Sequence, residues 1–332
     1  MQINKAVLEI FDFHASMAAY SDKELDISDT QIQDYISSHV VKALKDPALR
    51  TGSLSMHNCV AQALSSYNEG RVSFLEMSNQ LSQQLFEYMK QATESSIVDI
   101  IVCEAEGEKS YFCVLVCQAH AAYTHIRRAD ENGKTGAELV LYQAMLPTPS
   151  QKLQAFMAID RSDLSVRIFE PKGTYDGESC YLLSDKLLQI GTNQSTKDTV
   201  KKVKHIIGKV CEAHESDGVE ALAMAKTLIA KNAEVSDTLQ PEHIIDRVFA
   251  HHPMEQAEAK AELEKHDMMR PLPVAREFAT KEGAYQKIKT DTGIEITFPV
   301  CYMQDKEFIE ILTNDDGTLR IELKHINKII NK

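Results

Sequence analysis

Apolar and polar positions in the N-terminal part of the chain follow one strand pattern and then three helix patterns. The first apolar run is short enough to be a buried strand. Beyond it, Ser28 or Asp29 can accept backbone N–H groups at the start of a helix, and Asp46-Pro47 ends the helical spacing of its apolar residues. The expected elements are a strand at residues 3–13 and helices at 28–46, 57–68 and 73–92.

Strand patterns dominate the following region. The polar stretch 106–109 separates two apolar runs and predicts a hairpin, and residues 131–134 predict another turn. Cys113 and Cys117 are four residues apart in an apolar run, an even spacing that puts both on one strand face as small hydrophobic residues. The expected strands are residues 96–106, 109–126, 137–146, 153–163 and 164–178, the last two as an antiparallel pair.

A helical pattern returns in the second half of the chain. It runs from Thr196 to about Arg270, where Pro271 and Pro273 interrupt it. Alternation follows, and the Asn-Asp-Asp-Gly stretch at residues 314–317 is a strong hairpin turn. This pattern predicts a three-stranded antiparallel meander and a short basic tail. The face expected to be buried consists of Ile294, Ile296, Leu319, Ile321 and Leu323.

Together these patterns predict an α+β fold, with a mainly antiparallel sheet and helices, a helical middle segment and a C-terminal β meander. The length of 332 residues is enough for two or three domains. The expected domains are an α+β domain at residues 1–192, a helical segment at 193–275 and a small β meander with a basic tail at 276–332.

Composition places the chain among ordinary globular proteins, with 43% hydrophobic and 26% charged residues. No apolar run approaches the roughly 18 to 20 residues of a membrane span, and the N-terminal run is too short for a signal peptide. We therefore expect a cytoplasmic protein without a membrane partner. The seven cysteines include no Cys-x-x-Cys pair, so neither a disulfide framework nor a zinc ribbon is indicated, and no cofactor is expected.

The net charge of −13 argues against nonspecific coating of nucleic acid by the whole surface, because phosphate repels an acidic protein. The charge is unevenly divided. Residues 1–192 carry 16 basic and 25 acidic side chains, a net charge of −9, whereas residues 193–332 carry 20 and 24, a net charge of −4. The second part is therefore the better candidate for binding an anion.

The most concentrated positive charge lies in that second part, on a helix that Ser195 or Thr196 can cap. Five lysines fall between Lys197 and Lys209, while the apolar residues of the same helix form a separate stripe. Two interpretations stay open: a solvated face, which any amphipathic helix needs, and a surface that contacts DNA phosphate. The candidate DNA-contacting residues are Lys197, Lys201, Lys202, Lys204 and Lys209, with two weaker basic spots at Arg320, Lys324 and Lys328 and at Arg127 and Arg128.

Motifs for catalysis or metal binding are absent from the sequence. There is no G-x-G-x-x-G, Walker P-loop or G-x-S-x-G pattern. The pair His251-His252 is better explained by a helix that starts at Pro253 with His252 as its cap than by a metal site. Cys59 beside His57 is better explained as a helical core cysteine. We therefore assign no catalytic residue and no metal ligand.

Several segments share their order and pattern with one protein family, namely residues 23–47, 73–89, 121–129, 144–172, 181–189 and 293–323. On these segments the chain resembles the bacterial 37-kDa nucleoid-associated protein family, in its form from Gram-positive bacteria. The resemblance implies a cytoplasmic protein found with the nucleoid, without an established catalytic role. Some relatives carry a "KGRxGRK" type of stretch before the long helix. Residues 187–202 keep lysines here but lack the arginine pair.

Three functional hypotheses follow. The first is a nucleoid protein that contacts the backbone of double-stranded DNA weakly and without sequence preference. The second is an adaptor whose acidic N-terminal domain binds a protein of the chromosome machinery, such as a topoisomerase, without direct DNA contact. The third is a hydrolase whose site the sequence does not reveal. The sequence does not fix the oligomeric state, and a homodimer is one option.

Overall fold

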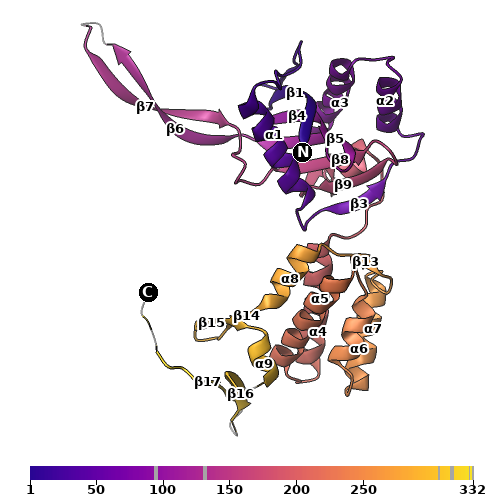
Figure 1. Cartoon of the computed structure of the whole chain (residues 1–332), viewed down its shortest axis with the longest axis vertical. Helices are drawn as coiled ribbons and strands as arrows, with labels where there is room; N and C mark the ends of the chain where they lie inside the picture. Colours follow the sequence, from indigo (N-terminus) through magenta and orange to yellow (C-terminus); the bar gives the residue numbers. More distant parts are fainter. Residues whose placement is uncertain (93–95, 130–132, 306, 315–317, 329, 331–332) are drawn as a thin grey trace. The chain divides into compact units, whose positions relative to one another are not determined.

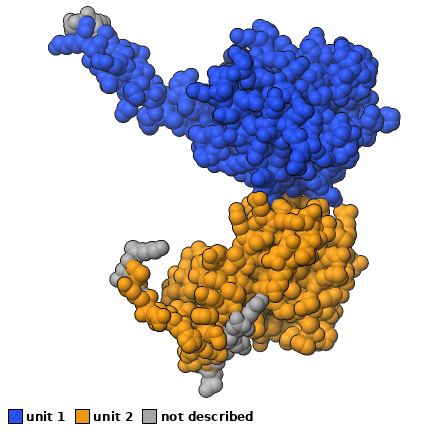
Figure 2. All heavy atoms as spheres, in the orientation of Figure 1, with its two compact units in different colours: residues 1–193 blue, residues 194–332 orange. Residues whose placement is uncertain are grey.

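The computed structural model describes residues 1–92, 96–129, 133–305, 307–314, 318–328 and 330. The chain divides into two compact units, unit 1 at residues 1–193 and unit 2 at residues 194–332 (Figure 2). The α+β fold class expected from the sequence is confirmed, because helices and a mainly antiparallel sheet make up the structure.

A seven-stranded antiparallel sheet forms the centre of unit 1, in the order β2-β1-β4-β5-β8-β9-β3 (Figure 1). Its central strands, β4 (Ile97–Glu106) and β5 (Ser110–Gln118), are buried on both faces, which explains their nearly continuous apolar sequence. The other strands are β1 (Gln2–Asp12), β2 (Met17–Ala19), β3 (Arg50–Ser53), β8 (Ala155–Asp160) and β9 (Ser165–Phe169).

Helices cover both faces of this sheet. One core joins the sheet to α2 (Cys59–Asn68), α3 (Phe74–Met89) and the short π-helix η1 (Leu182–Leu187). The other joins it to α1 (Thr30–Leu44), whose N-cap is Asp29. Cys113 and Cys117 both lie in this second core, which confirms that they share a strand face. These elements match the helices and the central strands expected from the sequence.

The expected single strand at residues 109–126 is wrong. It divides at Ala119 into β5 and a separate strand, β6 (His120–Ala129), which among the described strands pairs only with β7 (Thr135–Met145) (Figure 1). The reason is that β5 pairs with a neighbour on each edge and is buried, whereas β6 leaves the sheet. The turn expected at residues 131–134 lies partly outside the described residues. A further hairpin joins β10 (Lys172–Tyr175) and β11 (Glu178–Tyr181).

Unit 2 is mainly helical at its start. Its core lies between four helices and residues 268–279, which follow them. Within this helical part, β12 (Thr238–Leu239) pairs with β13 (Leu272–Pro273). The sequence did not predict α8 (Arg276–Ala284), which packs against α5. The other helices are α4 (Thr196–Ala213), α5 (Gly218–Val235), α6 (Pro241–Val248) and α7 (Pro253–Lys265).

The C-terminal strands form two separate hairpins in the described residues, rather than one three-stranded meander. One is β14 (Tyr285–Lys289) with β15 (Glu295–Pro299), and the other is β16 (Ile309–Thr313) with β17 (Leu319–Leu323), with α9 (Cys301–Asp305) between them. Part of the predicted turn at 314–317 lies outside the described residues.

The face expected to be buried in this C-terminal segment is also wrong. Ile294, Leu319 and Leu323 are exposed, and the buried apolar side chains among the described residues of these hairpins and their connection are Phe298, Val300 and Ile309. The physical reason is that a two-stranded hairpin without a second layer has no side that is fully covered.

Candidate nucleic-acid interface

The start of α4 fixes where its lysines lie. Ser195 caps the helix, because its Oγ accepts the backbone N–H of Asp198 at 3.1 Å and donates to the carboxylate of the same residue at 2.6 Å. Thr196 Oγ1 accepts the backbone N–H of Ala275 at 2.9 Å, which ties the first turn of α4 to the segment before α8. The acidic Asp198 also suits the positive end of the helix dipole.

The apolar stripe of α4 is buried as the sequence predicts. It packs into the core of unit 2 together with α5, α6 and α7. Because that stripe faces the core, the rotation of the helix is fixed and the lysines must lie along its remaining surface. The stripe consists of Val200, Val203, Ile206, Ile207 and Val210.

Two of the five lysines are used inside unit 2. Lys204 forms an ion pair with Glu282 of α8. Lys209 lies 3.3 Å from the carboxylate of Glu262 on α7, which Lys265 also contacts at 2.7 Å. Hydrogen bonds from Lys265 and Lys209 lower the pKa of Glu262, so its charge is held by these cations. These two lysines therefore join α4 to its neighbouring helices, and carboxylates offset their charges.

The other three lysines lie toward the N-terminal half of α4. Lys197 and Lys201 are exposed and one helical turn apart, and Lys202 beside them is half-buried. Within the described part of the chain, none of the three has a hydrogen bond or an ion pair to another side chain. The positive charge that is free to meet an external anion is therefore concentrated at Lys197, Lys201 and Lys202.

The C-terminal basic residues differ from these three lysines. Arg320 on β17 lies 3.2 Å from Glu322, and Lys324 forms an ion pair with Glu310 of β16. Lys328 is exposed beyond the hairpin. Neighbouring carboxylates thus offset most of the positive charge of this hairpin.

Arg127 and Arg128 belong to unit 1, on β6. Arg127 donates to Thr135 Oγ1 at 3.5 Å, and Arg128 lies 3.7 Å from Glu138 on β7. Of the ten candidate residues, the structure places five on one helix of unit 2, three at its C-terminal end and two in unit 1.

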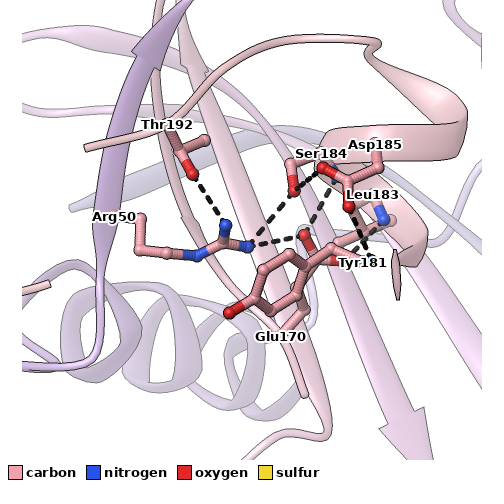
Figure 3. A network of polar contacts seen from close by, with 7 residues as sticks. All are labelled: Arg50, Glu170, Tyr181, Leu183, Ser184, Asp185 and Thr192. Atoms are coloured by element: carbon pink, nitrogen blue, oxygen red, sulfur yellow. Dashed lines mark hydrogen bonds and ion pairs between the residues drawn. The ribbon is translucent and has the colours of Figure 1, made fainter. Parts of the chain in front are cut away.

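A buried polar network in unit 1 was missed by the sequence patterns (Figure 3). The guanidinium of Arg50 on β3 donates to Glu170 at 2.8 Å, to Thr192 Oγ1 at 2.7 Å and to Ser184 Oγ at 3.3 Å. Glu170 accepts the backbone N–H groups of Leu183 and Ser184 at the start of η1. Burial raises the pKa of Glu170, and its partners oppose that shift. No local signal links two residues so far apart in the sequence.

This network is structural, because its charged groups are paired with one another and with fixed hydrogen-bond partners. It holds Thr192, and Asn193 next to it donates its backbone N–H to Thr51 O at 2.8 Å. The last residues of unit 1 are therefore fixed on strand β3, directly before the cap of α4.

A hollow of about 550 Å³ lies in unit 2 among α4, α5 and the end of α6, lined by Cys211, Asp217, Arg247, His251 and His252 among others. His252 is the N-cap of α7, with Pro253 at the first position of the helix, as the sequence predicted. No group of three metal-ligating side chains occurs in the residues that the structure describes.

Cys59 departs from expectation in unit 1. It is exposed rather than in the core, because it occupies the first position of α2.

Comparison with known proteins identifies one family. A family model described as nucleoid-associated protein YejK matches residues 9–331, which is nearly the whole chain. No curated protein matches the chain. None of the helices described is long and apolar enough to cross a membrane.

Proposed function

Because the chain belongs to the family of the nucleoid-associated protein YejK, we propose that it contacts the backbone of double-stranded DNA through the N-terminal half of α4. The contacting residues are Lys197, Lys201 and Lys202. Lys204 and Lys209 act within the protein, since each is paired with a carboxylate of a neighbouring helix.

The single observation that carries this proposal is the unequal pairing of the lysines on one helix. Exposed lysines without a carboxylate partner can release counterions from DNA when they meet phosphate, whereas a lysine that is already paired gains less. Three such contacts predict a slope of about −2.7 in the logarithm of the binding constant against the logarithm of salt concentration. Phosphate contacts carry no sequence information, so binding is weak and nonspecific.

A second candidate function is the adaptor, which is favoured by the charge of the first part of the chain. Residues 1–192 carry a net charge of −9, which suits a basic protein partner of the chromosome machinery and repels DNA. In this alternative the association with DNA is indirect, and the lysine face of α4 is only solvated.

The test replaces Lys197, Lys201 and Lys202 together with Gln, which removes charge and keeps helix propensity. Binding of two unrelated DNA duplexes is measured across a salt series. We expect equal weakening on both duplexes and a slope closer to zero by roughly 2 to 3. A matched control replaces Lys265, Lys287 and Lys289, which have carboxylate partners in the same unit, and changes the net charge by the same amount.

Two outcomes contradict the proposal. A folded triple variant with the affinity and slope of the parent makes the lysine face a solvated surface. A control variant that loses as much binding as the triple variant shows that net charge, rather than this helix, governs binding. If the purified parent binds no duplex, a pull-down from lysate with and without nuclease identifies the adaptor, because a protein partner survives nuclease treatment.

A further inference from the structure

Strands β6 and β7 form an isolated two-stranded hairpin, here called the arm and defined as residues 120–129 and 133–145. It pairs with no other strand among the described residues, and Figure 2 shows it standing clear of the rest of unit 1. Most of its side chains are exposed. A two-stranded hairpin alone is marginally stable in water, so an arm of this length is a candidate for contact with a partner.

The register of the arm places its most exposed apolar side chains on one face. Tyr123 lies opposite Leu141, and His125 lies opposite Leu139. Because directly opposed residues of two strands point to the same side, these four side chains share a face. Tyr123 is 73% exposed and Leu139 is 79% exposed, so this face presents apolar surface to solvent.

Nearer the tip, the same face carries a cationic side chain in place of apolar ones. There Arg127 lies opposite Ala137. The face therefore has three rows, from root to tip: Tyr123 with Leu141, His125 with Leu139, and Arg127 with Ala137. An aromatic ring stands at one end, a cation at the other and a leucine in the middle.

The root of the arm is fixed to unit 1 where β7 returns to the body. Pro147 O accepts hydrogen bonds from Tyr35 Oη at 2.8 Å and from His39 Nε2 at 3.1 Å, both on α1. Lys42 of the same helix donates to Ser150 O at 2.5 Å. The root of the arm is thus anchored on a helix that packs against the main sheet, which leaves the exposed end available to bind a partner.

Charge decides between the classes of partner. The sequence segment 120–145 carries three basic and three acidic side chains, so this segment has no net charge in a chain of net charge −13. A neutral surface gains little from the counterion release that drives DNA binding. For a second copy of the chain a neutral arm is well suited, because contact through projecting arms spares the two acidic bodies from close mutual repulsion.

The order of the rows makes the face complementary to itself. We propose that the arm is a self-association surface, in which two copies of the chain pack these faces together about a two-fold axis. With the axis at the middle row, Leu139 of one copy meets Leu139 of the other. Arg127 of each copy then lies over the Tyr123 ring of the other, which is a cation–π contact, and the small Ala137 leaves room for Leu141.

This association is independent of the DNA contact proposed above, because it uses residues of unit 1 alone. Dimerisation also places two lysine faces of α4 in one assembly. Two lysine faces in one dimer bind one duplex with higher avidity than either alone, if their spacing allows both to engage.

The first test measures the oligomeric state of the full chain by sedimentation, at concentrations up to about 100 µM. We expect a dimer, and the variant Tyr123→Ser/Leu139→Ser should raise its dissociation constant at least about tenfold. The control variant Val235→Ser/Met254→Ser changes two residues of unit 2 that are 81% and 73% exposed, and it should leave the constant unchanged. Circular dichroism and thermal melting check that each variant is folded.

The second test examines the axis itself, with the exposed Cys59 and Cys301 replaced by Ser. In this background, Leu139→Cys should form a disulfide-linked dimer under mild oxidation, since the two sulfur atoms meet at the axis. Thr124→Cys is the control, because Thr124 lies at a similar height on the opposite face of the arm. It should form much less cross-linked dimer.

Three results overturn the proposal. The first is a monomeric parent over this concentration range. The second is a dimer that persists unchanged in Tyr123→Ser/Leu139→Ser. The third is equal cross-linking of Leu139→Cys and Thr124→Cys. If the parent is monomeric and Tyr123→Ser/Leu139→Ser loses DNA binding, the arm binds nucleic acid instead. The triple variant of Lys197, Lys201 and Lys202 tests the DNA contact separately, because it should lose DNA binding and still form the dimer.

Discussion

At Glu9 a carboxyl group lies inside unit 1, and no described residue forms an ion pair with it. The side chain is on β1 and fully buried, and it accepts the backbone N–H of Ser21 at 2.7 Å. Burial raises its pKa from 4.5 to about 7. Burial likewise raises the pKa of Asp99 on β4 to about 6. Both groups hold a proton in the folded state at pH values where the unfolded chain has already lost it.

We predict that the free energy of unfolding falls as the pH rises from about 4.5 to above 7. The sign follows because the folded state binds more protons than the unfolded state in this window. Glu9→Gln should flatten this pH dependence. The loss in the free energy of unfolding between pH 5 and pH 8 should be smaller in the variant than in the parent, by up to roughly 3 kcal/mol. Denaturant unfolding at both pH values measures the effect.

Two other carboxyl groups, Asp99 and Asp160, show which part of the pH dependence belongs to Glu9. Asp99→Asn should remove a separate part of the slope at slightly lower pH. Asp160 does not interfere: although burial raises its pKa, hydrogen bonds from Lys109 and Ser162 bring it down to about 2, so its contribution is lost only in acid. An unchanged pH dependence in Glu9→Gln would mean that this carboxyl group ionises freely in the folded protein.

Local residue roles were predictable where the physics is local. Asp29 and Ser195 cap their helices because a cap needs only the side chain and the next few backbone N–H groups. The pairing of Arg50 with Glu170 was not predictable, and neither was that of Lys204 with Glu282, because each pair joins residues far apart in the sequence. The five lysines of α4 therefore looked equivalent in the sequence, although carboxylates offset two of them in the fold.

At the scale of elements, periodicity predicted most helices and the central strands, because their buried faces span whole turns or whole strands. It failed where the environment of the chain changes within one apolar run. Residues 109–126 keep a strand pattern throughout, yet β5 is inside a sheet and β6 belongs to the exposed arm. The C-terminal hairpins failed similarly, since alternation shows that a strand has two faces and does not show which neighbour covers one.

Contact between α5 and α8 depends on a glycine. A Cβ atom at Gly283 would meet Ala230 of α5 and would lie 2.6 Å from Lys226 O. Both obstacles belong to the body of α5 rather than to a flexible side-chain end, so the helices must separate to admit even a methyl group. The fully buried Ala279 one turn earlier on α8 adds a second small residue to this helix.

We predict that Gly283→Ala lowers the free energy of unfolding of unit 2 by about 1 to 3 kcal/mol, despite the better helix propensity of alanine. The matched control is Gly208→Ala on α4, where a Cβ meets no atom within 4 Å. That variant should be more stable by about 0.5 to 1 kcal/mol. Thermal melting compares them, and a Gly283→Ala protein as stable as the parent would show that α5 and α8 can move apart at little cost.

At the scale of the whole molecule, the division into two units separates two chemistries. Unit 1 has a net charge of −9 and holds the buried ion pair and the arm, and unit 2 holds the lysine face of α4. The resemblance in the sequence anticipated the family, and the family match over residues 9–331 confirms it. Neither could indicate which lysines are paired, because that depends on how α4, α7 and α8 pack.

At the boundary between the units, the residues on either side of Gln194 form hydrogen bonds within different units. Asn193 donates its backbone N–H to strand β3, and Ser195 caps α4. Each unit also has its own buried core. A cut between Asn193 and Gln194 therefore removes few interactions within either unit, and we expect residues 1–193 and residues 194–332 each to fold when expressed separately.

The last prediction assigns the two binding properties to these fragments. Residues 194–332 should still bind a DNA duplex, because Lys197, Lys201 and Lys202 stay on a capped helix. The fragment should bind with lower apparent affinity and a shallower salt slope than the full chain, because without the arm only one lysine face engages the duplex. Residues 1–193 should self-associate and bind no duplex. Sedimentation and a salt series on each folded fragment measure both properties. If residues 1–193 bind the duplex and residues 194–332 do not, the lysine face is not the contact, and the acidic unit must bind DNA through a surface other than α4.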